Sequence, residues 1–441
     1  MFLLAIRQII KYDPRADINR IIIIRKDLNG DCVKAEQLIH ESAEMKAEIT
    51  EKRKYLHSHA ETGFALENTV DYVKSELSAM GYTPKICGKS GLVAVVGGKK
   101  PGKVFLLRAD MDALPIREQS GLDFASGNDC MHACGHDMHT AMLLGAAKLL
   151  KKHEHELYGT VKLMFQPAEE ILEGAVDMIH AGVLENPRVD AALMIHVMSG
   201  VPFDVGTVIV SNSGVSAPAA DVFKIRVSGK GCHGSMPNMG IDPLTAAAHI
   251  LIAFQEIVAR ELAMNDRAVL TIGALQAGGA ANAIPDETIM SGSLRTFDEQ
   301  VRVKLKQRVN DIAVGIAAAF RAEASVEFGS GCPVLQNDKT LSVDVRQYVK
   351  DLLGDSKAFT VSELNADEGT DRASKSVGSE DFAYISQRVP SIMLALAAGE
   401  PKNGYIYPPH HPMVKFDNDA LDIGSAVYAY TAMRWLEDHV G

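Results

Sequence analysis

The sequence predicts an α/β fold, in which a mixed sheet is covered by helices on both faces and a second, ferredoxin-like domain is inserted. Three observations predict it. The chain has 441 residues, which is too long for one ordinary domain. Short β-rich runs alternate with helical segments before about residue 216. Between about 217 and 330 the order of elements is β-α-β-β-α-β, which is typical of the ferredoxin-like arrangement.

The first part of the chain contains the elements of the larger sheet. The predicted strands are short aliphatic runs: 92–96, 104–107, 160–165 and 191–195. The predicted helices are 45–80 with a loop at 57–63, 138–152, and a helix that ends near 181. The regular pattern begins near residue 45, so residues 1–44 are expected to be an N-terminal extension outside the fold.

The middle of the chain contains the second domain. Its predicted strands are 221–227, 268–275, 288–294 and 324–328, and its predicted helices are 243–263 and 298–322. We therefore expect 217–330 to be inserted, with 45–216 and 331–441 together forming the main domain.

Composition excludes several classes of partner. The net charge is −11 and there is no basic run, which argues against nucleic acid and against an anionic membrane surface. The apolar stretches near the N-terminus are too short to span a bilayer. The six cysteines are scattered and show no disulfide framework, which favours a reduced, cytoplasmic protein.

Polar residues gather where the predicted strands end. They are Asp110 and Asp112, Cys134 and His136, Glu169 and Glu170, His196, and the C-terminal string Tyr407-Pro-Pro-His-His-Pro412. Ligands of α/β sheets bind outside the carboxyl ends of the strands. Imidazole, thiolate and carboxylate groups suit a hydrolytic zinc or manganese site. A single such residue is usually a solvated strand end, but so many together favour a metal site.

The sequence also resembles the aminoacylase, hippurate hydrolase and indoleacetyl-amino-acid hydrolase family of metallopeptidases, from about residue 45 to the end. The resemblance is carried by six strings in the same order: LRADMDALPI, MHACGHDMHTAMLLGAA, FQPAEE, GCHGSMPNMGIDPLTAA, ANAIPDE and GSEDFAY. It implies a catalytic main domain and an inserted lid or dimerisation domain.

The resemblance implies two divalent metal ions, Zn or Mn, with Co or Ni possible. The implied ligands are Cys134, His136, Glu170, His196 and His410. His410 is selected because the family's ligand histidine usually stands two positions before a proline, here Pro412, and the neighbouring His411 is the alternative.

The resemblance also implies roles for residues beside the metals. Glu169 would be the general base, and Asp112 would orient a metal ligand. His233 would reach the oxyanion, often from a partner subunit. Asn282 and Arg295 would contact the free carboxylate of the substrate. Structural alternatives stay open for three of these residues. His233 could be a turn residue, Asn282 a turn former, and Arg295 a solvated strand end or an ion-pair partner.

The sequence thus predicts a metal-dependent amidohydrolase that cleaves N-acyl amino acids or similar small conjugates, or short peptides. The first alternative is a dipeptidase or carboxypeptidase. The second is a non-catalytic metal- or ligand-binding homologue, against which Glu169 argues, because a binding protein needs no base. A homodimer that forms through the inserted domain is expected from the resemblance.

Overall fold

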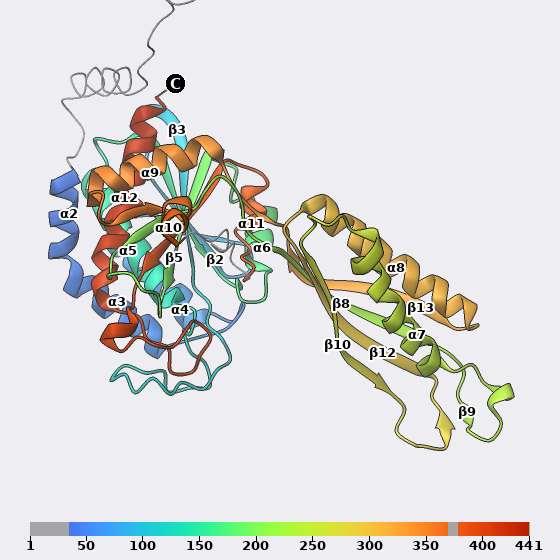
Figure 1. Cartoon of the computed structure of the whole chain (residues 1–441). Helices are drawn as coiled ribbons and strands as arrows, with labels where there is room; N and C mark the ends of the chain where they lie inside the picture. The colour runs from blue at the N-terminus through green and yellow to red at the C-terminus, as the bar shows by residue number, and fades with distance from the viewer. Residues whose placement is uncertain (1–34, 369–377, 441) are drawn as a thin grey trace, which may run out of the picture.

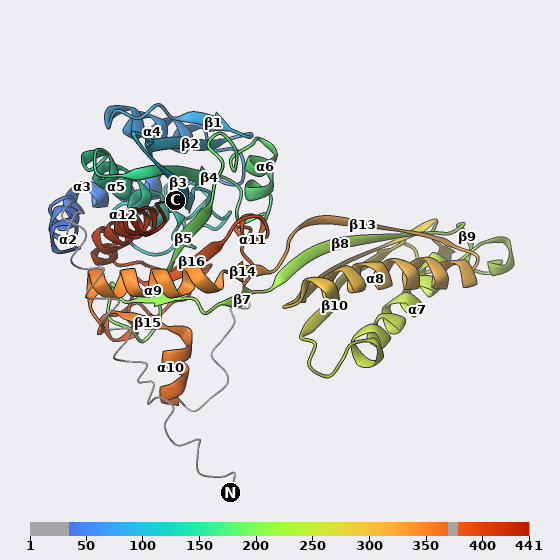
Figure 2. The same cartoon turned by 90° about the horizontal axis from the view of Figure 1, so that it is seen from above.

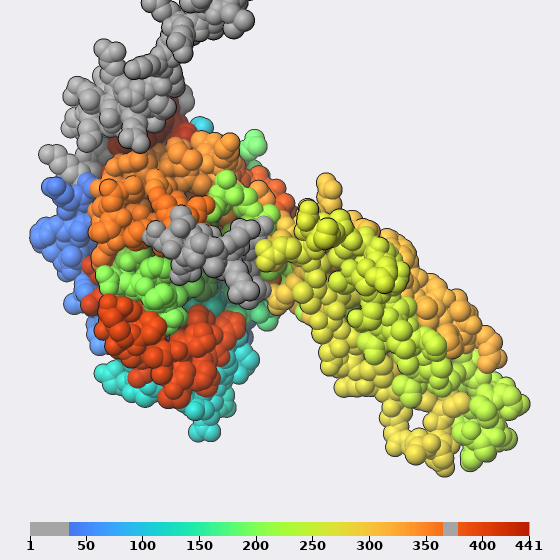
Figure 3. All heavy atoms as spheres, viewed as in Figure 1, coloured from blue at the N-terminus to red at the C-terminus, as the bar shows by residue number. Residues whose placement is uncertain are grey.

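The computed structural model describes residues 35–368 and 378–440. Most of the expected N-terminal extension, residues 1–34, lies outside the described residues. The described chain forms a main body around one large sheet and an elongated unit around a smaller sheet (Figure 1). The elongated unit stands off from the main body, to which it is joined at one end (Figure 3).

The larger sheet has eight strands among the described residues. They are β1 (Lys85–Cys87), β2 (Gly91–Gly97), β3 (Lys100–Asp110), β4 (Tyr158–Gln166), β5 (Ala191–Met198), β6 (Val208–Val210), β15 (Ala358–Thr360) and β16 (Ser391–Ala397). Their order is β1-β2-β4-β3-β5-β16-β6-β15. The central strands β4, β3, β5 and β16 are parallel, whereas β2 and β6 run antiparallel to their inner neighbours. The predicted mixed sheet is therefore confirmed.

Helices cover both faces of this sheet (Figure 2). One face is covered by α3 (Lys46–Ser58), α4 (Glu67–Ala79), α5 (His136–Lys152), α9 (Lys339–Leu353) and α12 (Leu421–Asp438). The other carries α6 (Gly174–His180) and α11 (Ala383–Ser386). Successive side chains of a strand point to opposite faces. Accordingly, Phe105 and Leu107 of β3 belong to the first core, and Leu106 belongs to the second.

The main body begins ten residues earlier than expected. Helix α2 (Ala35–Glu44) packs against α5 and α12, with Leu38 fully buried. His153 at the end of α5 lies with its Nε2 2.7 Å from a carboxylate oxygen of Glu41. The expected boundary at residue 45 is therefore wrong for residues 35–44. Of its three buried residues, Glu41 and Ser42 are polar, so an apolar pattern alone does not identify this helix.

The smaller sheet has the order β10-β12-β8-β13 and is antiparallel throughout. Its elements follow the chain as β8 (Ala219–Ser228), α7 (Pro243–Glu256), β10 (Ala268–Ala277), β12 (Glu287–Thr296), α8 (Glu299–Ala319) and β13 (Glu323–Cys332). This is the predicted ferredoxin-like arrangement. Asp242 and Asp298 cap the two helices by accepting backbone N–H bonds of the first turn. Helix α7 ends at Glu256 and continues as the π-helical turn η2 (Ile257–Glu261), so the helical segment ends two residues before the predicted residue 263.

Two short ladders complete the fold. At the junction, β7 (Gly214–Ala217) pairs with β14 (Leu335–Asn337). At the far end of the elongated unit, β9 (Cys232–His233) pairs with β11 (Ala283–Ile284) (Figure 1). No helix of the described chain combines the length and the apolar character needed to cross a bilayer.

Candidate metal centre

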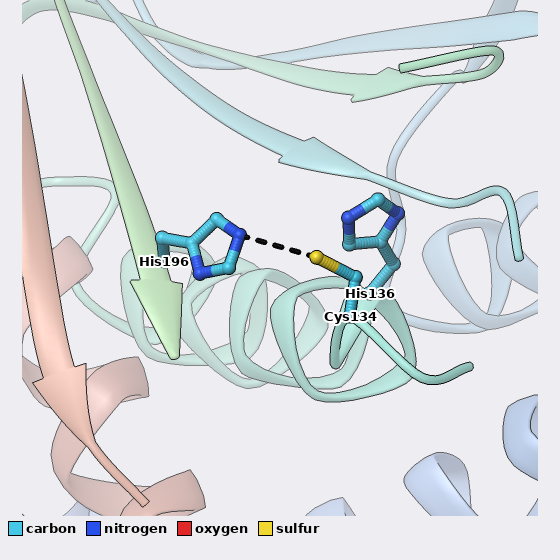
Figure 4. Close-up of side chains that lie close together, drawn as sticks. All are labelled: Cys134, His136 and His196. Carbon is cyan, nitrogen blue, oxygen red and sulfur yellow. Dashed lines mark hydrogen bonds between the residues drawn. The ribbon is translucent and has the colours of Figure 1, made fainter. Parts of the chain in front are cut away.

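Three of the predicted ligands meet beside the carboxyl end of the central strands. The ligand atoms of Cys134, His136 and His196 all lie within 4.8 Å of one another. Figure 4 shows the thiol of Cys134 close to both imidazoles, with its Sγ 3.5 Å from Nε2 of His196. Gly135 has a positive φ of 84°, and a Cβ there would lie 2.4 Å from Val197 Cγ2. Only glycine fits between the predicted ligands Cys134 and His136.

The other two predicted ligands join the same cluster. Cys134, Glu170 and His410 form a second group of three ligand atoms within 4.8 Å. His410 Nε2 is 3.5 Å from Glu170 Oε2, although the His410 side chain remains half exposed. His410 has a φ of 67°, an uncommon conformation for a residue with a Cβ. Because the two groups share Cys134, all five predicted ligands belong to one constellation.

His411, the alternative to His410, faces elsewhere. Its ring stacks on Tyr407 with a centroid separation of 4.3 Å. Its Nδ1 accepts a hydrogen bond from the backbone N–H of Met413. The geometry therefore favours His410 as the histidine of the cluster.

The imidazoles of His136 and His196 are held so that Nε2 faces the cluster. His136 Nδ1 donates to the backbone oxygen of Asp112 at 2.8 Å, and His196 Nδ1 donates to the backbone oxygen of Val197 at 2.7 Å. When these rings are neutral, as a metal ligand must be, this arrangement leaves the lone pair on Nε2. His136 Nε2 and Glu170 Oε1 are buried and have no hydrogen-bond partner. Buried polar atoms without partners, together with soft and hard donors, fit divalent metal ions.

Asp112 fixes the turn that carries both glutamates. Its Oδ1 accepts the backbone N–H of Glu169 at 2.9 Å, and its Oδ2 accepts that of Glu170 at 3.1 Å. The Asp112 side chain is fully buried. Both carboxylate oxygens thus hold the backbone of the turn, while the Asp112 carbonyl holds His136.

The crowding of these groups shifts their pKa values strongly. Burial raises the pKa of Glu170 to about 8, and the thiolate of Cys134 adds to this. Burial also raises the pKa of Cys134, but His196, His136 and His410 together bring it well below its usual range. Burial lowers the pKa of His196, but the neighbouring Cys134 outweighs this and raises it to about 9. Positive charge placed among these groups would favour their ligating forms.

Glu169 lies in the most acidic corner of the site. Only 6% of the residue is exposed. One carboxylate oxygen each of Glu169, Glu380 and Asp381 lie within 4.8 Å of one another. Burial raises its pKa well above the usual range, and the negative charges of Glu380 and Glu170 add to this. Such a carboxyl group is a good proton acceptor once nearby positive charge favours its ionised form.

Sequence reasoning did not assign Glu380, Asp381 or Arg108 to the site. The guanidinium of Arg108 is fully buried and donates to Asp110 at 2.6 Å, Glu380 at 2.9 Å and Asp381 at 3.1 Å. It therefore compensates much of the negative charge around Glu169. The only signal in the sequence was the pair of adjacent acids in the string GSEDFAY.

Asp110, whose role the sequence left open, supports the cluster from behind. His139 Nδ1 donates to Asp110 Oδ1 at 2.6 Å, and His139 Nε2 accepts the backbone N–H of Val197 at 2.8 Å. Burial lowers the pKa of His139 to about 4, which keeps its ring neutral. These bonds tie β3, α5 and β5 together next to His196.

Three residues that the sequence grouped with the site lie away from this cluster. His233 and Asn282 are exposed and lie on or beside the short β9–β11 ladder, at the far end of the elongated unit (Figure 1). Arg295 lies near the end of β12, where its Nη1 donates to Ser379 Oγ at 2.8 Å. Ser379 precedes Glu380, so this bond joins the elongated unit to the acidic corner of the main body.

Comparison with known proteins identifies the family. Residues 106–434 match the family described as peptidase family M20/M25/M40. An IAA-amino acid hydrolase ILR1-like 2 of Arabidopsis thaliana is 36% identical over 394 residues, which are 88% of this chain and 84% of that protein. An N-acetylcysteine deacetylase of Bacillus subtilis is 36% identical over 392 residues, which are 87% and 96% of the two chains.

Solved structures agree with this assignment. A dinuclear metal-binding peptidase of the M20 family from Bacillus subtilis has a TM-score of 0.72 and 33% identity. The match covers 90% of this chain and 99% of that one, so both sheets are included. The family match, the two curated relatives and the fold lead to one conclusion: this chain belongs to peptidase family M20/M25/M40.

Proposed function

We propose that this chain is a metal-dependent amidohydrolase that cleaves the amide bond of N-acyl amino acids or similar small conjugates. The observation that carries the proposal is the constellation of Cys134, His136, Glu170, His196 and His410 beside the buried carboxyl group of Glu169. The names of the relatives, an amino acid conjugate hydrolase and an N-acetylcysteine deacetylase, support the substrate class.

We propose two divalent cations at this constellation, Zn or Mn, with Co or Ni compatible with the same donors. The mixture of thiolate, imidazole and carboxylate supports this range of metals. Such cations, when bound, lower the pKa of water and polarise a carbonyl group. The described cysteines are all free, which supports the proposed reduced, cytoplasmic setting.

Residues of the chain transfer the proton and hold the reacting groups in position. Glu169 accepts a proton from the attacking water and delivers it to the leaving nitrogen. Asp112 keeps Glu169 and Glu170 in place through their backbone N–H groups. Arg108 limits the repulsion between Glu169 and the acids behind it when Glu169 is ionised.

In this proposal the chain forms a homodimer, and residues at the far end of one subunit's elongated unit complete the active site of the other subunit. Attack on the amide produces an oxyanion, which requires a hydrogen-bond donor. We assign that donor to His233 of the partner subunit, because His233 lies away from the cluster of its own chain. Asn282 beside it and Arg295 at the junction are assigned to the substrate carboxylate.

The test combines metal counting with hydrolysis. Metals per chain are measured by mass spectrometry, and N-acetyl, N-benzoyl and indoleacetyl amino acids are assayed together with dipeptides. We expect Glu169→Gln to abolish turnover while metal content stays near that of the parent. The exposed Glu185 offers a matched control, since Glu185→Gln should leave both unchanged. Full activity of Glu169→Gln would remove Glu169 as the base, and cleavage of dipeptides alone would favour the dipeptidase alternative.

A further inference from the structure

Hydrogen bonds hold the backbone of the turn that carries His233. His233 pairs with Ala283 in the β9–β11 ladder, and its carbonyl accepts the N–H of Met236 at 2.8 Å. The N–H of Gly234 donates to the carbonyl of Asn282 at 2.7 Å. A Cβ on Gly234 would lie 2.8 Å from that same oxygen, so the approach of the two strands requires glycine. The backbone of His233 is therefore held from both sides.

The ring of His233 is held by the residue two positions later. The backbone N–H of Ser235 donates to His233 Nδ1 at 3.1 Å, and Ser235 Oγ lies 2.8 Å from the same nitrogen. A backbone N–H can only donate, so Nδ1 must carry a lone pair and no proton. A neutral imidazole has one proton on its two nitrogens, so that proton is on Nε2.

We infer that Ser235 is a positioning residue whose backbone N–H fixes His233 in the tautomer with its proton on Nε2. The exposed ring then presents an N–H donor to whatever approaches its Nε2 edge. The other tautomer would present a lone pair there, which repels an oxyanion instead of stabilising it. The inference rests on the proposed function for its catalytic meaning, but the tautomer itself can be measured without any substrate.

The experiment uses the full chain labelled with ¹⁵N-histidine. Long-range ¹H–¹⁵N correlation spectra distinguish a protonated from an unprotonated ring nitrogen, and His233→Gln identifies the signals of His233 by their loss. We expect the parent to show protonated Nε2 and unprotonated Nδ1. Ser235→Pro removes the backbone N–H that donates to Nδ1 and should give a mixture of tautomers, whereas Ser235→Ala removes the hydroxyl alone, keeps that N–H and should retain the parental tautomer.

Hydrolysis of an N-acetyl amino acid is measured on the same variants. We expect kcat to fall about twofold to tenfold in Ser235→Pro with little change in KM, which is the effect of losing about one hydrogen bond, and to stay near the parental value in Ser235→Ala. We expect a loss of about a hundredfold in His233→Ala, the cost of one oxyanion donor. The exposed Ser325 on β13 is the matched control, and Ser325→Ala should change neither quantity.

Two results would overturn the inference: a parental His233 protonated on Nδ1, or a Ser235→Pro variant whose tautomer matches the parent. A chain that cleaves no conjugate at all while His233 shows the expected tautomer would instead refute the proposed function. The two failures are therefore distinguishable.

Discussion

The strongest test of how the metal centre is held is the substitution Asp112→Asn. Asp112 makes two hydrogen bonds from a fully buried carboxylate, to the backbone N–H groups of Glu169 at 2.9 Å and Glu170 at 3.1 Å. Asparagine has nearly the same shape, but only one of its two terminal atoms accepts a hydrogen bond. The other would place an NH₂ group against a backbone N–H donor.

The magnitude follows from these contacts. A hydrogen bond to a charged group contributes about 1.5–3 kcal/mol, and the orphaned donor remains buried. At about 1.4 kcal/mol for each factor of ten, this corresponds to a loss of roughly 10- to 100-fold in metal affinity or kcat/KM. The loss should occur in both, because Glu170 is a proposed ligand and Glu169 is the proposed base.

The assay counts metals per chain by mass spectrometry and measures kcat/KM on an N-acetyl amino acid. Asp190→Asn provides the control, because Asp190 Oδ2 also accepts one backbone N–H, from Val104 at 2.8 Å, but toward the other end of β3. We expect the control to stay within about twofold of the parent. If Asp112→Asn keeps both its metal and its kcat/KM within the same range, the two bonds do not determine the geometry of the site.

Two further predictions concern neighbouring residues. His410→Ala should reduce metal content and turnover sharply, while His411→Ala should leave metal content near normal, because His410 faces the cluster and His411 stacks on Tyr407. Equal metal loss in both variants would contradict the assignment of His410. Glu41→Gln should lower the melting temperature at neutral pH by weakening the contact of α2 with His153. Burial raises the pKa of Glu41, but its hydrogen bonds, mainly to His153, lower that pKa to about 2, below the ordinary 4.5. The stabilisation by the Glu41 carboxylate is therefore complete above about pH 4.5 and is lost as the pH falls toward 2. The melting-temperature difference between parent and variant should shrink over that interval, and a constant difference would contradict the reasoning.

Much of the cluster could be predicted from the sequence because parallel strands end at one edge. Topology alone brings together the polar residues that follow β3 and β4 and those at the start of α5. This is why Cys134, His136 and Glu170 could be identified from the sequence. His196 was expected just past a strand, but β5 continues to Met198 and the residue lies within it. The choice between His410 and His411 depended on backbone conformation, which the spacing of two adjacent residues does not reveal.

The acidic corner behind Glu169 could not be predicted in the same way. Glu380 and Asp381 lie more than 200 residues from Glu169 in the chain, and adjacent acids usually indicate solvated surface. Their place in the site depends on Arg108, whose complete burial is a property of the packed structure. Helix α2 was missed for a related reason, since its burial depends on α5 and α12, which follow it in the chain.

The separation between the His233 turn and the metal cluster has a genetic consequence. In the proposed dimer each active site combines the cluster of one subunit with the His233 turn of the other. A Glu169→Gln homodimer is expected to be inactive and a His233→Ala homodimer nearly so, but their heterodimer contains one intact site. Random reassociation of equal amounts makes half of the dimers mixed, so the mixture should recover about a quarter of parental activity. Two defective alleles of this protein would then complement each other in one cell.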